Sequence, residues 1–248
     1  MIPYFSWSEF SIFGLTIYVW GILVSLGFLA GIFASYFYAK KKGINATLIL
    51  ESGFWIILAG IIGGRLGQIL YEPSLLMHPF ELVQIWTGGM SFFGGLIGAS
   101  GALLLFLWKR HTLTWETIDV FAFGLPVGEM IGRIGCFLIH DHPGGETSFF
   151  LGVLYPDGVV RFDHGLLLVL SSAVLAVIFF IFRKKMFRPG SMFAFWALWE
   201  GCVRFLLDFD RVLDVRYWGL TPGQYLAMAL AILGILIIFK DKFIKKYE

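Results

Sequence analysis

Charged residues are scarce in this 248-residue chain, as are cysteines and basic residues near its start. Only 15% of the residues are charged and 58% are hydrophobic, which excludes an ordinary soluble domain and indicates an integral membrane protein. Two cysteines, Cys136 and Cys202, are too few for a disulfide framework. The first Lys or Arg is Lys40, so the charged region of a cleavable signal peptide is missing, and we expect the first apolar segment to remain as a membrane span. A net charge of +2 gives no indication of a nucleic-acid partner.

Apolar segments long enough to cross a bilayer, about 20 residues each, occur seven times. They cover residues 14–38, 47–67, 89–108, 116–139, 164–182, 190–207 and 221–239. The fourth is interrupted by Glu116, Asp119, Glu129 and Arg133. The sequence therefore predicts an all-α, polytopic membrane protein with seven transmembrane helices.

Basic residues gather at alternate connections between these segments. The residues concerned are Lys40, Lys41, Lys42, Lys109, Arg110, Arg183, Lys184, Lys185, Arg188, Lys240, Lys242, Lys245 and Lys246. Because such residues favour the cytoplasmic side, the pattern predicts an outside N-terminus and a cytoplasmic C-terminus. An odd number of spans requires the two ends to differ, so the two signals agree.

The other arginines fall in the outer halves of spans or in outer loops, where no lysine joins them. They are Arg65, Arg133, Arg161, Arg204, Arg211 and Arg216. A guanidinium is a planar fork that suits bidentate binding of phosphate, whereas an ammonium is a point charge. The alternative is that these arginines pair with outer acids such as Glu129, Asp163, Asp208 and Asp214.

Two glycine-rich stretches, residues 60–67 and 94–98, carry the small-residue spacing that lets membrane helices approach closely. We interpret them as packing surfaces rather than a phosphate-binding loop, although Gly88 and Gly89 could belong to a loop. Residues 71–86 are typical of an amphipathic segment lying on the membrane surface.

Residues 145–163 are predicted to form a polar outer loop. Within it, residues 152–154 and 159–160 flank the turn sequence Tyr155-Pro156-Asp157-Gly158 and indicate a small hairpin. No domain boundary is visible, so we expect residues 1–248 to form a single transmembrane domain with a small periplasmic loop region around 140–163.

Two stripes of charge indicate a hydrated cavity between the fourth and sixth spans. Glu129 and Arg133 share one helix face, as do Glu200, Arg204 and Asp208, with Arg211 one turn further on. Charge that faced lipid would be costly, so both stripes are expected to face each other. The alternative interpretation is a structural lattice of salt bridges that joins two helices.

The turn His140-Asp141-His142 directly follows the first stripe. It could be a metal site, an ordinary polar turn, or a catalytic turn that positions substrate, and the last interpretation is favoured by its closeness to Arg133. A third close metal ligand is not evident, because His78 and His164 are distant along the chain. Cys136 is most simply a small buried residue, and a lipid-carrying thiol is the alternative.

Short motifs in the second, third, fourth, sixth and seventh spans follow one another in a recognisable order. They are Gly63-Gly64-Arg65-Leu66-Gly67, then Gly88-Gly89-Met90-Ser91-Phe92 with Gly94-Gly95-Leu96-Ile97-Gly98, then Gly132-Arg133-Ile134-Gly135-Cys136-Phe137 with Asp141 and Gly144, then Arg204-Phe205-Leu206-Leu207-Asp208 with Arg211, and finally Gly223-Gln224. Together they resemble the signatures of the prolipoprotein diacylglyceryl transferases.

The resemblance implies a transferase of lipoprotein biosynthesis, with several spans in the bacterial inner membrane. Such an enzyme moves a diacylglyceryl group from phosphatidylglycerol to the thiol of a lipobox cysteine and releases glycerol phosphate. The expected partners are phosphatidylglycerol, prolipoprotein signal peptides with a lipobox cysteine, and the surrounding membrane lipid. Neither a metal nor an organic cofactor is expected, and no nucleic acid.

Site residues are expected in two groups. The catalytic candidates are Asp141, His140, His142 and Arg204. The substrate-binding candidates are Arg133, Arg65, Asp208, Arg211, Glu129 and Gly144.

Four positions depart from the family pattern and mark a divergent member. Phe93 stands where the family has a histidine that is a candidate base, Cys136 replaces Asn, Asp141 replaces Glu, and Trp20 replaces Tyr. The base must then come from elsewhere, and the turn at 140–142 offers imidazoles with an ordinary pKa of about 6.5. Two alternatives stay open: an enzyme of the same fold with a different acceptor or lipid, and a non-catalytic phospholipid-binding protein.

Overall fold

The computed structural model describes residues 1–12, 15–84, 90–184, 188–212 and 214–244. Seven long helices make up most of this part of the chain. They are α1 (Val19–Lys42), α2 (Ala46–Gln68), α4 (Phe92–Lys109), α5 (Trp115–Ile139), α6 (His164–Phe182), α7 (Ser191–Leu207) and α8 (Pro222–Ile244). Six of them, all except α7, are long and apolar enough to cross a membrane. The predicted spans are therefore helices, with ends that mostly agree within a few residues.

Short elements lie between and before these helices. The short helices are the 3-10 helices η1 (Pro73–Leu76) and η3 (Asp208–Asp210) and the one-turn helix α3 (Pro79–Val83). The strands are β1 (Ile2–Pro3), β2 (Glu9–Ile12), β3 (Leu15–Tyr18), β4 (Pro143–Glu146), β5 (Val153–Leu154) and β6 (Val160–Asp163). The expectation of an all-α chain is wrong for these strands, which form a four-stranded sheet in the order β1-β5-β6-β4 and the separate hairpin β2-β3.

The first predicted span began too early. Residues 15–18 are apolar enough to extend a helix, but they pair as strand β3 with β2, and helix α1 starts only at Val19. The physical reason is that Thr16 and Ile17 are β-branched and favour extended backbone. At the other end α1 continues through its three terminal lysines to a left-handed residue, Gly43.

The small hairpin predicted between residues 152 and 160 is confirmed. Strands β5 and β6 are antiparallel, and the amide of Gly158 donates to the carbonyl of Tyr155 across the turn. The predicted surface segment after α2 contains η1 and α3, with Met77 and Phe80 strongly exposed. Some predicted features lie outside the described residues: Trp86, Gly88, Gly89, Lys185, Lys245 and Lys246.

Local chemistry explains several helix starts. The side chains of Asn45, Ser91 and Asp163 accept backbone N–H groups at the first turns of α2, α4 and α6. Helix α7 is preceded by Gly190, which has no side chain to cap it, and the amides at its start are satisfied instead from another helix. Asp119 of α5 accepts from the amide of Gly190 at 2.7 Å and from that of Phe193 at 2.9 Å. The carboxylate thereby ties the start of α7 to α5.

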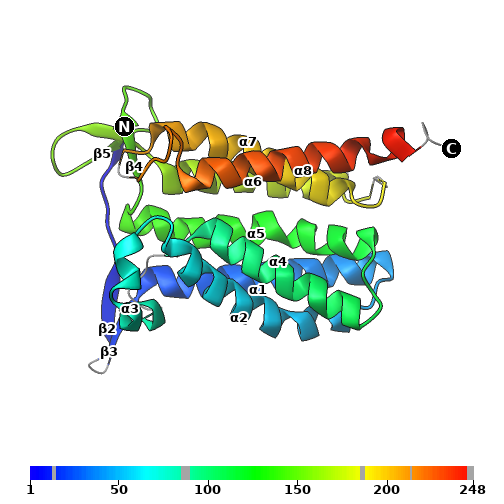
Figure 1. Ribbon diagram of the computed structural model, residues 1–248. Coiled ribbons are helices and arrows are strands. Elements are labelled where there is room, and N and C mark those ends of the chain that lie inside the picture. Colours follow the sequence, from blue (N-terminus) through cyan, green and yellow to red (C-terminus); the bar gives the residue numbers. More distant parts are fainter. Residues whose placement is uncertain (13–14, 85–89, 185–187, 213, 245–248) are drawn as a thin grey trace.

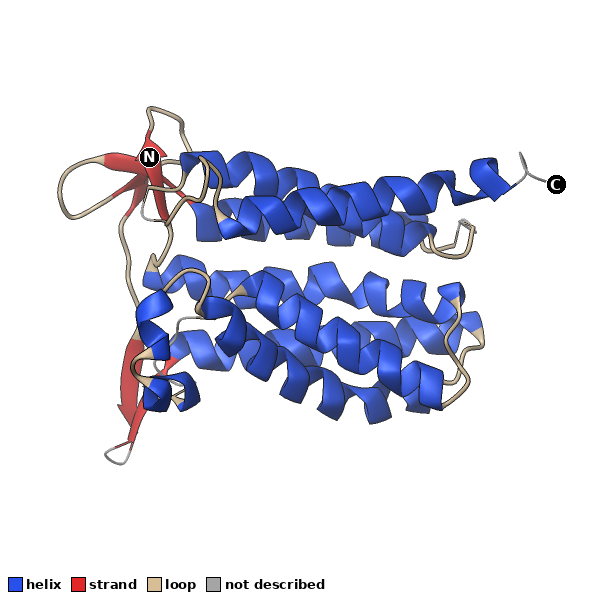
Figure 2. Cartoon of the chain, in the orientation of Figure 1, coloured by secondary structure: helices blue, strands red, loops and turns tan. Residues whose placement is uncertain are grey.

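Helix α5 lies between two groups of helices (Figure 1). On one side it packs against α1, which lies near the closely paired α2 and α4. On the other side it packs against α6 and α7, with α8 paired to α7. The four-stranded sheet and the N-terminus lie at one end of the helices, and the last described turn of α8 lies at the other (Figures 1 and 2).

Close helix contacts depend on the glycines. A Cβ atom added at Gly98 of α4 would collide with the carbonyl oxygen of Ala59 in α2, and one added at Gly94 would collide with that of Gly63. The interpretation of residues 60–67 and 94–98 as packing surfaces is thus confirmed.

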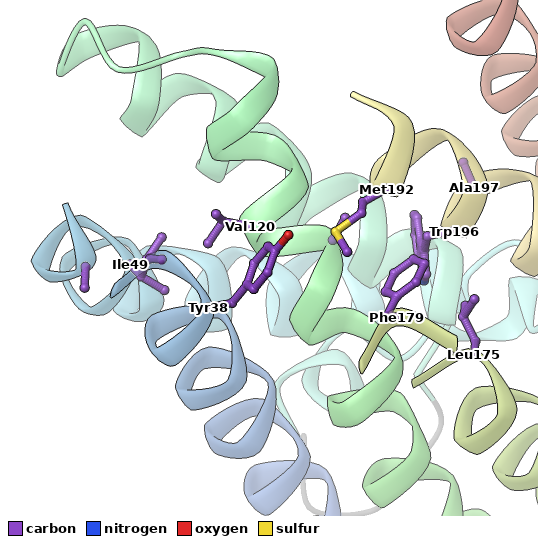
Figure 3. Packing of buried hydrophobic residues seen from close by; sticks show 11 residues of the cluster. Tyr38, Ile49, Val120, Leu175, Phe179, Met192, Trp196 and Ala197 are labelled. Atoms are coloured by element: carbon purple, nitrogen blue, oxygen red, sulfur yellow. The ribbon is translucent and has the colours of Figure 1, made fainter. Parts of the chain in front are cut away.

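The apolar core occupies the end of the helices away from the four-stranded sheet. Figure 3 shows Tyr38, Ile49, Val120, Phe179 and Trp196 gathered from five helices, and all are almost completely buried. The buried residues Arg65, Glu200 and Arg204 lie in the halves of α2 and α7 that are farther from this core.

Candidate active site

A cavity of about 310 Å³ opens at the end of the helices next to the four-stranded sheet. Its walls come from the last turn of α2, the first turns of α4, α6 and α8, the last turn of α7, and the segment that follows α5. Six predicted site residues line it: Arg133, Asp141, His142, Arg204, Asp208 and Arg211. The fold thus brings together charges that lie more than 70 positions apart in the sequence.

Arg204 is the most firmly held charge in the cavity wall. Its Nε donates to Glu200 one turn earlier, and its Nη2 donates to Glu129 of α5 at 2.5 Å. The face of the guanidinium covers the ring of Phe92 at 3.4 Å from the centroid. Only 6% of the surface of Arg204 is exposed, and two carboxylates fix the position of its guanidinium.

Arg133 shares partners with Arg204 but is held more loosely. Its Nε lies 3.7 Å from the same Glu129 carboxylate, and its Nη1 donates to the sulfur of Cys136 at 3.6 Å, a long and weak hydrogen bond. The guanidinium lies 5.5 Å from the ring centroid of Phe92. Arg133 is therefore the arginine with more donor capacity left for a ligand.

The two predicted stripes do face each other, as the cost of charge against lipid requires. Glu129 bridges them, because its carboxylate contacts an arginine from each helix. The structural lattice and the hydrated cavity are thus the same feature: salt bridges join α5 to α7, and they form one wall of the cavity.

Helix α5 ends at Ile139, and the left-handed backbone of His140 turns the chain back across the cavity. His142 then lies between two charged groups. The Nη2 of Arg211 lies 3.0 Å from its Nδ1, and the Oδ2 of Asp141 lies 3.6 Å from its Nε2. Burial lowers the pKa of His142 well below its ordinary value, and the charges of Arg211 and Arg133 lower it further. The ring is therefore neutral at pH 7.

Asp141 presents its carboxylate to the same space, with 31% of the side chain exposed. Enclosure by the protein raises the pKa of Asp141 to about 6, although Arg133 and Arg211 oppose that shift. At pH 7 the carboxylate form predominates, and it can take up a proton at little cost. Such a group suits proton transfer.

Arg211 is fixed on its other side by two acids. Its Nη1 lies 3.2 Å from Asp214 and 3.7 Å from Asp208. Asp208 is itself held, since the hydroxyl of Thr221 at the start of α8 donates to it at 2.9 Å. While Nη1 of Arg211 faces these two acids, its Nη2 is available to donate to His142.

His140 does not line the cavity. Its Nδ1 lies 2.6 Å from Asp163, and its Nε2 lies 3.2 Å from the backbone carbonyl of Phe5. Its ring stacks on Tyr4 at 4.3 Å. Both ring nitrogens are therefore engaged, Nδ1 by Asp163 of β6 and Nε2 by the N-terminal segment, and the geometry disfavours His140 as a base.

Three other predicted site residues, Arg65, Glu129 and Gly144, lie outside the lining of the cavity. Arg65 is buried in α2, and its Nη2 donates to the carbonyl of Gln84. Gly144 packs against η3, and a Cβ atom added there would lie 2.5 Å from Asp210 Oδ2 and 2.8 Å from His164 Nε2. The absence of a side chain at Gly144 therefore lets strand β4 lie close to Asp210 and His164.

Sequence reasoning missed His164, Tyr71 and Phe92 as residues of the cavity. His164 was set aside because it lies far along the chain, yet its amide bonds the carbonyl of His142, which brings the two rings into one region. The sequence feature that could have indicated a cavity residue is the position of His164 at the start of a span, directly after a polar loop. Phe93, the residue in place of the family histidine, also lines the cavity.

One set of possible metal ligands exists in the described part of the chain. The sulfur of Cys136, a carboxylate oxygen of Asp141 and a ring nitrogen of His142 lie within 4.8 Å of one another. Arg211 can only donate, so the Nδ1 of His142 must accept, and the neutral ring then carries its proton on Nε2. Neither nitrogen has a free lone pair for a cation, and the guanidinium of Arg133 lies against the sulfur. The geometry thus favours a hydrogen-bonded group, and a metal-free site stays a prediction.

Comparisons with known proteins agree with the motifs. The family model described as prolipoprotein diacylglyceryl transferase matches residues 8–240. A phosphatidylglycerol–prolipoprotein diacylglyceryl transferase of Wolbachia pipientis wMel is 32% identical over 237 residues, which cover 86% of this chain and 88% of that protein. A protein of the same description from Campylobacter hominis is 30% identical over 249 residues, which cover 93% of this chain and 89% of that one. A third, from Cereibacter sphaeroides, is 31% identical over 222 residues, with 76% and 75% covered.

Proposed function

Because this chain belongs to the prolipoprotein diacylglyceryl transferase family, we propose that its cavity is the place where phosphatidylglycerol meets a lipobox cysteine. The protein is a transferase that moves a diacylglyceryl group from phosphatidylglycerol to prolipoprotein. The acceptor atom is the thiol sulfur of the lipobox cysteine in the signal peptide.

The reaction makes three demands on the site. A carbon–sulfur bond forms at the glycerol carbon of the diacylglyceryl group, and the bond from that carbon to the phosphate oxygen breaks. The electron pair leaves with glycerol phosphate, whose charge must be stabilised. The thiol must lose its proton, since the thiolate is the nucleophile.

Arg133 is the phosphate ligand in this proposal. It lines the cavity, and its contacts with Glu129 and Cys136 are long enough to be exchanged for stronger bonds to phosphate oxygens. Arg204, which is held by Glu129 and Glu200, contributes a fixed positive charge beside the leaving group. The observation that carries the proposal is this pair of arginines from α5 and α7 in one cavity.

The remaining predicted residues fall into supporting roles. Glu129 sets the spacing of the two arginines, and Asp208 holds Arg211 in the cavity wall. Arg65 supports the neighbouring backbone at Gln84. The turn at Asp141 and His142 supplies the proton acceptor that Phe93 cannot provide.

The membrane topology belongs to the same proposal. Helix α7 has 17 residues, which is at the short end of the range of about 17–25 for a span, and we propose it as the seventh. Basic clusters then place the C-terminus in the cytoplasm and the cavity at the periplasmic face of the bacterial inner membrane. Residues 1–248 form one transmembrane domain, with the region around 140–163 on the periplasmic side.

A transfer assay tests the function. The purified protein is incubated with phosphatidylglycerol vesicles and a lipobox peptide, and both lipidated peptide and released glycerol phosphate are measured. Equal amounts of the two products support the proposal. Glycerol phosphate without lipidated peptide would indicate another acceptor, and lipid binding without either product would indicate a non-catalytic protein.

A further inference from the structure

The turn after α5 offers two groups that could accept the thiol proton, His142 and Asp141. Both line the cavity, and the charge of Arg133 acts on both. The contacts of the two residues differ, and only one of the two residues has a lone pair left to accept a proton from a substrate.

The partner of His142 decides its tautomer. A guanidinium has five N–H donors and no acceptor, so the contact of 3.0 Å between Arg211 Nη2 and His142 Nδ1 requires Nδ1 to accept. The neutral ring therefore carries its proton on Nε2, which points to Asp141 Oδ2 at 3.6 Å. The lone pair on Nδ1 of His142 is occupied, and its one N–H is on the nitrogen that lies 3.6 Å from the carboxylate, which is longer than a hydrogen bond.

The position of Arg211 is itself well determined. Asp208 and Asp214 hold its Nη1, and the hydroxyl of Thr221 holds Asp208. The tautomer of His142 is thus set by a chain of contacts that starts in α8 and η3.

From this geometry we infer that Asp141 is the catalytic base that takes the thiol proton, and that His142 and Arg211 are positioning residues that direct the carboxylate into the cavity. The inference rests on the proposed function. It assigns no catalytic role to His140, whose nitrogens bind Asp163 and Phe5.

The surroundings of Asp141 suit this role. Arg133 and Arg211 are the cations that act on it, Asp163 is the neighbouring anion, and burial raises its pKa to about 6. At pH 7 the group is mostly ionised and ready to accept a proton, and it lies on the same wall as the arginine proposed to bind phosphate.

The proton transfer balances within the proposed reaction. The S–H proton of the lipobox cysteine moves to a carboxylate oxygen of Asp141, and the thiolate sulfur attacks the glycerol carbon. The electron pair of the broken carbon–oxygen bond stays with the phosphate oxygen of glycerol phosphate. Asp141 then releases its proton to the departing phosphate or to water, which restores the carboxylate.

Two pairs of variants separate a base from a positioning residue. Asp141→Asn keeps the size of the side chain but cannot accept the proton, whereas Asp141→Glu keeps a carboxylate. His142→Gln offers an oxygen to Arg211 and an N–H to Asp141 but has no basic nitrogen, whereas His142→Ala offers neither. For each variant kcat/KM for transfer to a lipobox peptide is measured from pH 5 to 8, together with vesicle binding and the thermal midpoint.

We expect Asp141→Asn to lose at least about 100-fold of kcat/KM while vesicle binding and the thermal midpoint stay unchanged. The wild type should gain activity as the pH rises through about 6, because the carboxylate form is the active one, and Asp141→Glu should keep such a rise. His142→Gln should retain at least a tenth of wild-type activity and the same rise, and His142→Ala should fall well below it.

The opposite pattern would overturn the inference. If His142→Gln is as inactive as His142→Ala while Asp141→Asn stays active, the imidazole is the base. Failure of the proposed function is a separate result, because then the wild-type protein itself transfers no diacylglyceryl group to the peptide at any pH.

Discussion

Replacing Arg133 by lysine keeps the positive charge of the cavity and removes only the shape of the donor. Arg133 contacts Glu129 at 3.7 Å and Cys136 at 3.6 Å, so little of its hydrogen bonding is committed to the protein. A guanidinium can bind two phosphate oxygens at once, but an ammonium binds as a point charge. The substitution should therefore weaken lipid turnover without unfolding the protein.

The size of the effect follows from the bonds that are lost. A hydrogen bond to a charged group contributes about 1.5–3 kcal/mol, and the loss of one of two such bonds predicts a drop in kcat/KM of roughly 10- to 150-fold. The thermal midpoint should change little, since the long contacts of Arg133 contribute little to stability.

Arg161→Lys is the matched control. Arg161 lies in strand β6, away from the cavity lining, and pairs with Asp157 at 2.9 Å on the protein surface. Lysine can keep that pair, which is worth at most about 1 kcal/mol, so activity should fall less than about fivefold. Equal activity of the Arg133→Lys and Arg161→Lys variants in the transfer assay would refute the phosphate-binding role of Arg133.

Three further predictions concern topology and packing. A cysteine placed at Lys41 should be protected from an impermeant thiol reagent added outside intact cells, and labelling there would reverse the proposed orientation. Gly98→Ala should lower the free energy of unfolding in detergent by about 1–3 kcal/mol, because a methyl group would push against the carbonyl of Ala59. Gly101→Ala is the control, since a Cβ there meets nothing within 4 Å. Equal thermal midpoints of the two variants would contradict the packing argument. Asp119→Ala should lower the free energy of unfolding by about 1–3 kcal/mol, because two amides at the start of α7 lose their acceptor. A thermal midpoint equal to that of the wild type would mean that water replaces the carboxylate.

Helix positions could be predicted from the sequence because apolar length is a local property. The segment predicted at 164–182 coincides with α6, and the one at 190–207 differs from α7 by a single residue. The charge stripes were equally readable, since a spacing of four places side chains on one helix face whatever the rest of the chain does. Arg133 and Arg204 were therefore identified as cavity residues before the fold was known.

Pairings between distant segments could not be predicted in this way. The three residues at 140–142 look equivalent in the sequence, but the N-terminal segment reaches across to His140 and leaves His142 to Arg211. Nothing local to His140 indicates that Phe5 is its partner. For the same reason His164 could not be placed beside His142, because only the pairing of β4 with β6 brings them together.

Strand β1 has a consequence for the assembly of the protein. Residues 2–3 pair in parallel with residues 153–154, and the amide of Trp7 bonds the carbonyl of Leu138. These partners are synthesised about 130–150 residues later, a delay of roughly 7–30 s at common translation rates. The first residues of the chain therefore cannot form these contacts until the four long helices α1, α2, α4 and α5 have been synthesised. Closure of the four-stranded sheet is thus a late event in biogenesis, and so is the contact of Phe5 with His140, the residue before Asp141.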